Sequence, residues 1–395
     1  MTINLDRFLS VADFERAARR RLPRLVHAFV AGGAEDSVSL RANREAFEAL
    51  MFRPRGLSGV AGISQSVELW GRRYASPIGV APMGVTAICR HECELALARA
   101  ARAADLPFIL SGASTMPMEQ LQRETPGIWY QGYFPGDTAR LGRILQRLER
   151  AAIDVLVVTS DTPVAGNREN NLRNGFLIPF RPSARLAWDG MLHPRWLVDV
   201  LARTLLTSGV PRFSNLYEEI GPPITEEPAQ GFRGGRELLT WEHLSWLRER
   251  WPGRLVVKGI LHPADAREAA ARKLDGVIVS NHGGRQLDGA MAPLLALPAI
   301  KAAVPADFPL MIDGGFRRGA DVLKAVALGA RIVFLGRPML YGATIAGQGG
   351  VGRVIDILQA EIQRNLALLG IADIRNLGED SLQPGQGSCS PMSSP

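Results

Sequence analysis

The sequence predicts an α/β fold: a closed (β/α)8 TIM barrel with a helical cap at its N-terminal end and a long insertion after the fourth strand. Three observations predict it. Eight short apolar runs alternate with helical patterns, polar residues gather where those runs end, and the chain has 395 residues. Such barrels run from about 200 to more than 400 residues. The alternative is an open doubly wound sheet, which usually has fewer strands and a glycine fingerprint after the first.

The eight predicted strands are short and apolar on both faces, as buried parallel strands are. They are 78–82, 108–111, 129–133, 155–161, 255–259, 276–282, 310–315 and 332–337. Helical patterns follow nearly every strand, at 91–104, 117–123, 137–151, 240–251, 263–273, 292–303, 319–328 and 351–369. Eight strand–helix units in one chain favour closure into a barrel over an open sheet.

The flanks of the barrel differ in character. Residues 1–77 carry one helical pattern (13–31) and then Arg- and Pro-rich connections, which predicts an N-terminal cap on a barrel spanning 78–380. The tail 381–395 is poor in apolar residues and is predicted to be disordered. Gly347-Gln-Gly-Gly-Val-Gly352 spells a dinucleotide-type glycine motif, but it follows a helical pattern rather than a strand, so we interpret it as the start of a helix.

The predicted insertion, 176–239, is about 60 residues long, whereas loops of this kind usually have 2–6. Leu197, Leu201 and Leu205 recur every fourth residue, and other large apolar side chains and arginines accompany them. These are Trp188, Met191, Leu192, Trp196, Val198 and Leu206, with Arg181, Arg185, Arg195, Arg203 and Arg212. A basic amphipathic helix of this type suits a membrane interface. The alternative is packing against the barrel or a second subunit.

Composition excludes several classes of protein. Apolar residues make up 46% and charged residues 22% of the chain, which is typical of a soluble globule with a sizeable core. No apolar run approaches the roughly 18 residues of a membrane span, and no secretory signal is visible. Three cysteines are too few for a disulfide framework, which favours the cytoplasm. The net charge of +7 favours an anionic substrate or lipid surface; we expect neither a nucleic-acid partner nor a metal.

Polar residues stand at the C-terminal end of nearly every predicted strand, the place where barrel enzymes carry their chemistry. They are Ser111, Gln131, Tyr133, Thr159, Asp161, Lys258, His282, Asp313 and Arg337. A single polar residue there would serve as a strand cap. Polar residues at seven strand ends that meet at one rim predict a functional site.

The residue types at this rim predict acid–base chemistry on an anion. His282 is the best general base, because imidazole titrates near working pH. Asp161 could orient its ring. Arg168 and Arg285 are candidates for holding a carboxylate, since guanidinium forms a bidentate fork. Each of these residues taken alone could instead be structural.

A phosphate site is predicted after the last two strands, where barrels usually build one from glycine amides and an arginine. Residues 313–319 read Asp-Gly-Gly-Phe-Arg-Arg-Gly, and Gly336-Arg337 follows the eighth strand. Lys258 at the same rim could neutralise an anionic cofactor ring. A buried lysine without an anion would be costly.

At these residues the sequence resembles the FMN-dependent α-hydroxy-acid oxidase and dehydrogenase family. The motifs are Gly-Gly-Ala-Glu-Asp (32–36), Val-Lys-Gly (257–259), Ser-Asn-His-Gly-Gly-Arg-Gln-Leu-Asp (280–288), the 313–319 run and Ala-Leu-Gly-Ala (327–330). They span almost the whole chain, and the 280–288 run is highly specific. Residues 189–196 and 246–252 resemble the (S)-mandelate dehydrogenase branch.

The resemblance implies a barrel, usually tetrameric, that binds FMN non-covalently. It implies that His282 is the catalytic base with Asp161 as its partner, that Arg168 and Arg285 hold the substrate carboxylate, and that Tyr133 bonds the substrate hydroxyl. It places Lys258 beside the flavin, where it would stabilise the reduced anion. The other implied cofactor contacts are Ala81, Pro82, Met83, Ser111, Gln131, Thr159, Ser280, Asp313, Gly315, Arg317, Gly336 and Arg337.

The sequence departs from the family at the substrate end of the site. Phe29 stands where the family usually has a tyrosine that binds the carboxylate. One hydrogen bond to a charged group, worth about 1.5–3 kcal/mol, is therefore missing. Ala113 replaces a bulky aromatic residue of the glycolate-oxidising branch, and Gly84 is also small. Both substitutions indicate a roomier pocket.

The function that the resemblance implies is oxidation of an (S)-2-hydroxy acid to the 2-oxo acid. We expect a mandelate-like substrate first and a lactate-like one second, with electrons passing to a membrane quinone or similar acceptor through 181–212. In mandelate dehydrogenase the corresponding loop binds the membrane, so we expect a cytoplasmic protein on the inner face of the cell membrane. The alternatives are an oxidase that makes H2O2 from O2, and a non-catalytic barrel that binds phosphate ligands.

Overall fold

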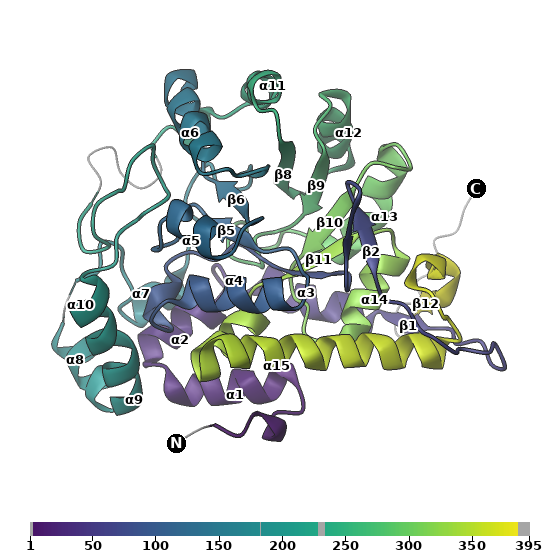
Figure 1. The fold of residues 1–395 in the computed structure, drawn as a ribbon, viewed down its shortest axis with the longest axis horizontal. Helices are drawn as coiled ribbons and strands as arrows, with labels where there is room; N and C mark the ends of the chain where they lie inside the picture. Colours follow the sequence, from purple (N-terminus) through teal and green to yellow (C-terminus); the bar gives the residue numbers. More distant parts are fainter. Residues whose placement is uncertain (1–2, 182, 228–233, 386–395) are drawn as a thin grey trace.

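A computed structural model of the chain describes residues 3–181, 183–227 and 234–385. Eight parallel strands form one sheet in the order β4-β11-β10-β9-β8-β7-β6-β5, and a bridge between Val80 and Phe108 joins its two edges. The predicted (β/α)8 barrel is confirmed (Figure 1). Its strands are β4 (Ile78–Val80), β5 (Ile109–Ser111), β6 (Trp129–Gly132), β7 (Val155–Thr159), β8 (Arg254–Ile260), β9 (Gly276–Val279), β10 (Leu310–Asp313) and β11 (Ile332–Leu335).

Helices pack outside the strands at the places that the apolar spacing predicts. In α6 (Thr138–Arg150), Leu141, Ile144 and Leu148 share one buried face, and Asp137 caps the first turn through the amides of Ala139 and Arg140. The other barrel helices are α4 (Cys93–Ala103), α5 (Met118–Glu124), α11 (Trp241–Arg250), α12 (Pro263–Ala271), α13 (Pro293–Ala303), α14 (Gly319–Ala327) and α15 (Arg337–Leu369).

Helix α15 begins at Arg337, directly after β11, and not at residue 351 as predicted. Its dihedral angles are non-helical at Ala346 and Gly347, so the chain folds back there as a second helical segment. A Cβ on Gly350 would lie 2.1 Å from the carbonyl oxygen of Gly342. The glycine motif therefore permits close packing of two helical segments, which explains it without a nucleotide.

The N-terminal cap corrects two predictions. The expected helix 13–31 is two helices, α1 (Val11–Arg21) and α2 (Arg24–Ala31), because Pro23 interrupts the hydrogen bonding between them. A helix not predicted, α3 (Val38–Glu48), follows, and its first amides bond to the carboxylate of Asp288. The cap also contains η1 (Leu5–Arg7), β1 (Leu50–Phe52), β2 (Val67–Leu69) and β3 (Arg72–Tyr74), and η2 (Thr86–Ile88) follows β4.

The prediction that the disordered tail starts at residue 381 is wrong, because the chain is ordered beyond that point. After η5 (Ile374–Asn376) and η6 (Glu379–Ser381), the strand β12 (Leu382–Pro384) pairs antiparallel with β1. Leu382 is buried by this pairing, so a segment poor in apolar residues is ordered by contacts with a distant part of the chain. Residues 386–395 lie outside the described residues.

The insertion between β7 and α11 forms a helical layer at one edge of the molecule (Figure 1). It contains α7 (Glu169–Arg173), α8 (Ala184–Met191), α9 (Pro194–Trp196), the π-helix η3 (Leu197–Ala202), α10 (Arg203–Ser208) and η4 (Arg236–Leu238). Trp196 Nε1 donates to the carbonyl of Ile88 over 2.7 Å, and Asp199 forms a 2.7 Å ion pair with Arg21. Within the described ranges, no helix has the length and hydropathy needed to cross a membrane.

Candidate active site

A cavity of about 460 Å³ opens at the C-terminal ends of the barrel strands. Most of the predicted site residues line it, although they come from all parts of the chain. They are Phe29, Ala81, Pro82, Met83, Gln131, Tyr133, Thr159, Arg168, Lys258, His282, Arg285, Asp313, Gly315, Arg317, Gly336 and Arg337. The barrel brings them together because every parallel strand ends at the same rim.

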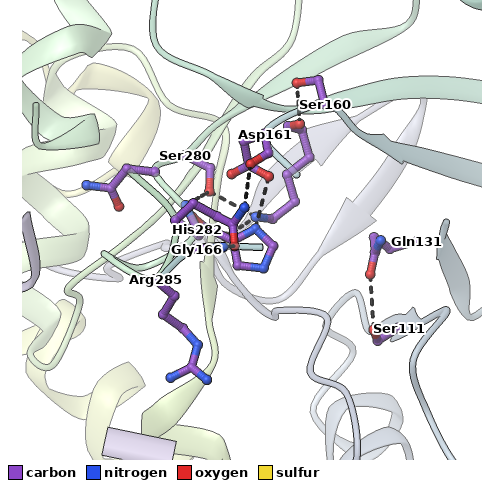
Figure 2. A network of polar contacts seen from close by, with 12 residues as sticks. Ser111, Gln131, Ser160, Asp161, Gly166, Ser280, His282 and Arg285 are labelled. Carbon is purple, nitrogen blue, oxygen red and sulfur yellow. Dashed lines mark hydrogen bonds and ion pairs between the residues drawn. The ribbon is translucent and has the colours of Figure 1, made fainter. Parts of the chain in front are cut away.

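Three predicted residues lie one layer behind the cavity wall. Ser111 donates to Gln131 Oε1 over 3.1 Å, and Ser280 Oγ accepts from Lys258 Nζ over 2.9 Å. The Asp161 carboxylate lies behind His282 (Figure 2). These residues orient the side chains that do line the cavity, as a second layer of polar groups does in many sites.

His282 is held by its backbone and by its ring. Its φ is 56°, a left-handed conformation that a non-glycine residue rarely adopts and that often marks a functional site. Its Nδ1 lies 2.9 Å from Asp161 Oδ1 (Figure 2). An ionised carboxylate only accepts hydrogen bonds, so Nδ1 carries the proton and Nε2 is left as the basic nitrogen.

Burial and charge tune this pair. Burial, together with the charges of Lys258 and Arg168, lowers the pKa of His282 below its ordinary value, although the charge and hydrogen bond of the Asp161 carboxylate raise it. Burial alone would raise the pKa of Asp161, but the charge and hydrogen bond of His282 hold it below its usual range. The pair is therefore a neutral imidazole on an ionised carboxylate at neutral pH, the state a general base needs.

Lys258 supplies a buried positive charge beside this pair. It is 4% exposed, and its Nζ forms a 2.9 Å ion pair with Asp313 Oδ2. Burial would lower the pKa of Lys258, but the charges of Asp313 and Asp161 outweigh it and raise that pKa. The lysine stays protonated, so it can face an anionic ligand across the cavity.

Two partly buried arginines of the cavity, Arg285 and Arg337, form no ion pair with a carboxylate among the described residues. Arg285 donates to the carbonyl of Gly32 over 2.8 Å, and Arg337 donates to the carbonyls of Val30, Gly32 and Gly283. Burial and the charges of Arg168 and Arg337 hold the pKa of Arg285 well below its usual range; burial, and then Arg317, lowers that of Arg337 to about 10. Cations that are largely withdrawn from water and have no carboxylate partner indicate anionic ligands.

Phe29 lines the cavity beside Arg285 and has no hydroxyl group to offer. Its ring stacks on Phe176 at 4.2 Å between centroids, and the Arg285 guanidinium lies 5.2 Å from its centroid. The aromatic face therefore supports the guanidinium through a cation–π contact. Phenylalanine has no donor, so the loss of one hydrogen bond to the substrate stays a prediction.

The cavity has the groups that FMN requires. Gln131 Nε2, Thr159 Oγ1 and Asp313 Oδ1 are buried and have no hydrogen-bond partner among the described residues, so they are available to a ring and its side chain. A Cβ on Gly315 would lie 2.7 Å from the carbonyl of Asn43, and its φ is 85°, so only glycine fits there. The first turn of α15 starts at Arg337, which gives a phosphate both helix amides and a guanidinium.

The sequence did not reveal four lining residues from the insertion: Ile178, Phe213, Leu216 and Arg236. The Arg236 guanidinium lies 4.3 Å from the centroid of the Tyr133 ring. The length of the insertion after strand four was the only signal. Nothing in its composition showed that part of it folds back over the barrel mouth.

Comparisons with known proteins agree with this site. The model of the FMN-dependent dehydrogenase family matches residues 18–384. An (S)-mandelate dehydrogenase of Pseudomonas putida is 40% identical over 375 residues, 95% of this chain and 93% of that protein. An L-lactate dehydrogenase of Azorhizobium caulinodans is 37% identical over 374 residues, 94% of this chain and 97% of that protein.

The solved structures agree as well. The structure described as the monotopic membrane protein (S)-mandelate dehydrogenase matches with a TM-score of 0.87 and 38% identity, over 96% of this chain and 100% of that chain. A mandelate oxidase mutant crystallised with (S)-mandelic acid matches with a TM-score of 0.79 and 33% identity, over 96% and 98%. With its barrel, its cavity and its relatives in agreement, the chain belongs to the FMN-dependent dehydrogenase family.

Proposed function

We propose that this FMN-dependent enzyme oxidises (S)-2-hydroxy acids with a bulky apolar side chain, of the mandelate type, to 2-oxo acids. The observation that carries the proposal is His282, hydrogen-bonded to Asp161, in one cavity with Arg168 and Arg285. A base and two cations at this spacing suit an alcohol next to a carboxylate. A barrel that only binds phosphate ligands would not need the base.

The chain's own residues account for binding and proton transfer. Arg168 and Arg285 hold the substrate carboxylate, and Tyr133 bonds the hydroxyl group. His282 Nε2 takes the hydroxyl proton while Asp161 stabilises the imidazolium that forms. The O–H and C–H bonds of the alcohol break and a C=O bond forms.

When bound, FMN would supply the acceptor for the two electrons and the second hydrogen of this oxidation, and the electrons would then go to a further acceptor. Gln131 and Thr159 would contact its ring, while Gly315, Arg317 and Arg337 would hold its phosphate end. Lys258 offsets negative charge beside the ring. A quinone-like molecule is the proposed final acceptor, and O2 is the alternative.

The substrate end of the cavity favours an aromatic side chain over a methyl group. Apolar side chains line it, and small residues leave room between them: Phe29, Val85, Ile178, Phe213 and Leu216, with Gly84, Ala113 and Ala165. Burying a phenyl ring against such walls contributes binding energy that a lactate methyl cannot. A lactate-like acid is therefore the second candidate.

We expect anaerobic bleaching of the bound flavin when the purified holoenzyme meets (S)-mandelate. The test follows flavin absorbance with a panel of (S)- and (R)-2-hydroxy acids. Bleaching by none of them would refute the proposed function. Admitting air and measuring H2O2 then separates the two acceptors, because rapid stoichiometric peroxide formation identifies an oxidase.

We further propose that the insertion docks on the inner face of the cell membrane, with the enzyme as a homotetramer. The supporting observation is a set of exposed apolar side chains on α8, η3 and α10, here named the membrane-docking face: Trp188, Met191, Leu192, Val198, Leu201, Leu205 and Leu206. Arginines 181, 195 and 203 of the same segment are also exposed. Many exposed large apolar side chains in one segment favour an interaction site, and arginine favours anionic lipid. If light scattering gave a molar mass that does not correspond to four chains, the tetramer would be refuted.

We expect Leu206→Glu, which places a charge on a side chain that is 87% exposed, to reduce binding to vesicles of phosphatidylethanolamine and phosphatidylglycerol by about 10-fold or more. Co-sedimentation measures it. The matched control is Leu368→Glu on α15, also exposed, which should bind as the parent does. If the parent, Leu206→Glu and Leu368→Glu bound the vesicles equally, the membrane-docking face would not be the anchor.

A further inference from the structure

A second hydrophobic cluster lies between the insertion and the barrel mouth. Val85, Phe213, Leu216 and Ile224 are buried in it, and Tyr133 and Ile178 pack against it. Phe213 and Leu216 also line the active-site cavity. The segment 211–217, here named the 211–217 wall, therefore belongs to the cavity, although it follows soon after α10, one of the helices that carry the membrane-docking face.

Hydrogen bonds fix the 211–217 wall to the barrel. Asn215 accepts from the amide of Met118 and donates to Ser114 Oγ and the Met116 carbonyl, each within 2.8 Å. The Ser214 amide donates to the Ser114 carbonyl over 3.2 Å. Ser214 Oγ donates to the Thr115 carbonyl over 2.8 Å. Polar side chains thus face the barrel while the neighbouring apolar ones face the cavity.

Two further side chains hold the outer carbonyls of the wall. Buried Arg147 donates to the carbonyls of Ser214 and Tyr217, each over 2.9 Å, and pairs with Glu119 at 2.7 Å. The hydroxyl group of Tyr130, within β6, donates to the Asn215 carbonyl over 2.7 Å. With this many bonds to buried groups, the wall is a fixed surface and not a mobile lid.

The wall meets the substrate end of the cavity and not the phosphate end. Its cavity-facing side chains pack beside Tyr133 and Val85. The groups suited to phosphate come instead from the ends of β10 and β11. Given the proposed function, we infer that Phe213 and Leu216 contact the substrate side chain and set the enzyme's preference for a bulky apolar 2-hydroxy acid.

The test changes the volume of one wall residue in both directions in the holoenzyme. Leu216→Ala removes contact with a phenyl ring, so kcat/KM for mandelate relative to lactate should fall about 10-fold, while a naphthyl 2-hydroxy acid gains relative to mandelate. Leu216→Trp should fill the space and exclude mandelate while lactate is still oxidised. The matched control is Ile220→Ala, an exposed apolar residue of the same insertion, which should keep the parent ratios.

Binding supplies a readout that does not need turnover. The dissociation constants of the aromatic and the aliphatic 2-oxo acids, titrated calorimetrically, should change in the same order as the kinetic ratios. Retained flavin and melting temperature show whether each variant is folded; if Leu216→Ala is not, Phe213→Leu replaces it. Parent ratios in folded wall variants would overturn this inference alone, whereas a parent flavin that no 2-hydroxy acid bleaches would overturn the proposed function.

Discussion

His282→Asn is expected to lower kcat roughly 10²–10⁴-fold, the range that general-base catalysis contributes, while the protein still binds FMN. The replaced group is the only imidazole that lines the cavity among the described residues. Asparagine suits the test because it tolerates the left-handed conformation at this position, where φ is 56°. The backbone of the 280–288 motif is therefore retained. Stopped-flow bleaching of the flavin by mandelate measures the loss.

The matched control is His262→Asn. His262 is exposed and caps α12 by accepting from the amide of Ala264. Asparagine is a good helix cap, so this variant should keep both its stability and its activity. If His282→Asn turned over mandelate at the parent rate, His282 would not be the base, whatever its distance from Asp161.

The companion variant Asp161→Asn tests the partner through pH. The free enzyme needs a neutral His282, so kcat/KM should rise with pH through the pKa of that imidazole. The Asp161 carboxylate favours the charged imidazole and so raises this pKa. Removing the carboxylate lowers the pKa, so the acid limb of the profile should move to lower pH while kcat falls. A limb that moves to higher pH would contradict this arrangement.

The sequence predicted the barrel because its signals are local. Each strand is a short apolar run with polar residues at its end, and closure brings those ends to one rim. Elements ordered by distant partners were predicted poorly. Strand β12 is held by β1 across the length of the chain, and α3 takes its cap from Asp288 in the active-site motif. Neither partner can be identified from the pattern beside the element.

The residues of the candidate site divide in the same way, into those with a local sequence signal and those placed by distant contacts. His282, Asp161 and the arginines were predictable because they stand at strand ends or in specific motifs. The 211–217 wall was not, because Ser214 and Asn215 bond to the loop after β5, and only that fold-back turns Phe213 and Leu216 toward the cavity. The amphipathic segment of the insertion has residues that fit each of its two interpretations. Trp196 and Val200 are buried against the protein, whereas Val198 and Leu206 stay exposed and are free to meet a membrane or a second subunit.

Arg285→Met is expected to weaken binding of the 2-oxo acid by at least about 30-fold, since loss of one partner of a buried charge pair costs roughly 2–5 kcal/mol. The same substitution should raise the melting temperature of the FMN-free protein. Burial and the charges of Arg168 and Arg337 destabilise the charged form of Arg285. Its side-chain hydrogen bond to the Gly32 carbonyl offsets little of this free-energy cost. Replacing a buried, uncompensated charge by an apolar side chain of similar length often stabilises a protein.

Opposite signs for affinity and stability distinguish a functional cation from a structural one. Calorimetric titration measures the affinity in holoenzyme, and thermal unfolding of the FMN-free protein measures the stability. The matched control, Arg267→Met on the exposed face of α12, should change neither. A lower melting temperature for Arg285→Met would mean that the cation–π contact with Phe29 and the Gly32 hydrogen bond make Arg285 part of the scaffold. A higher melting temperature, together with loss of 2-oxo acid binding, would mean that Arg285 lowers the stability of the protein and is retained because the substrate carboxylate requires its charge.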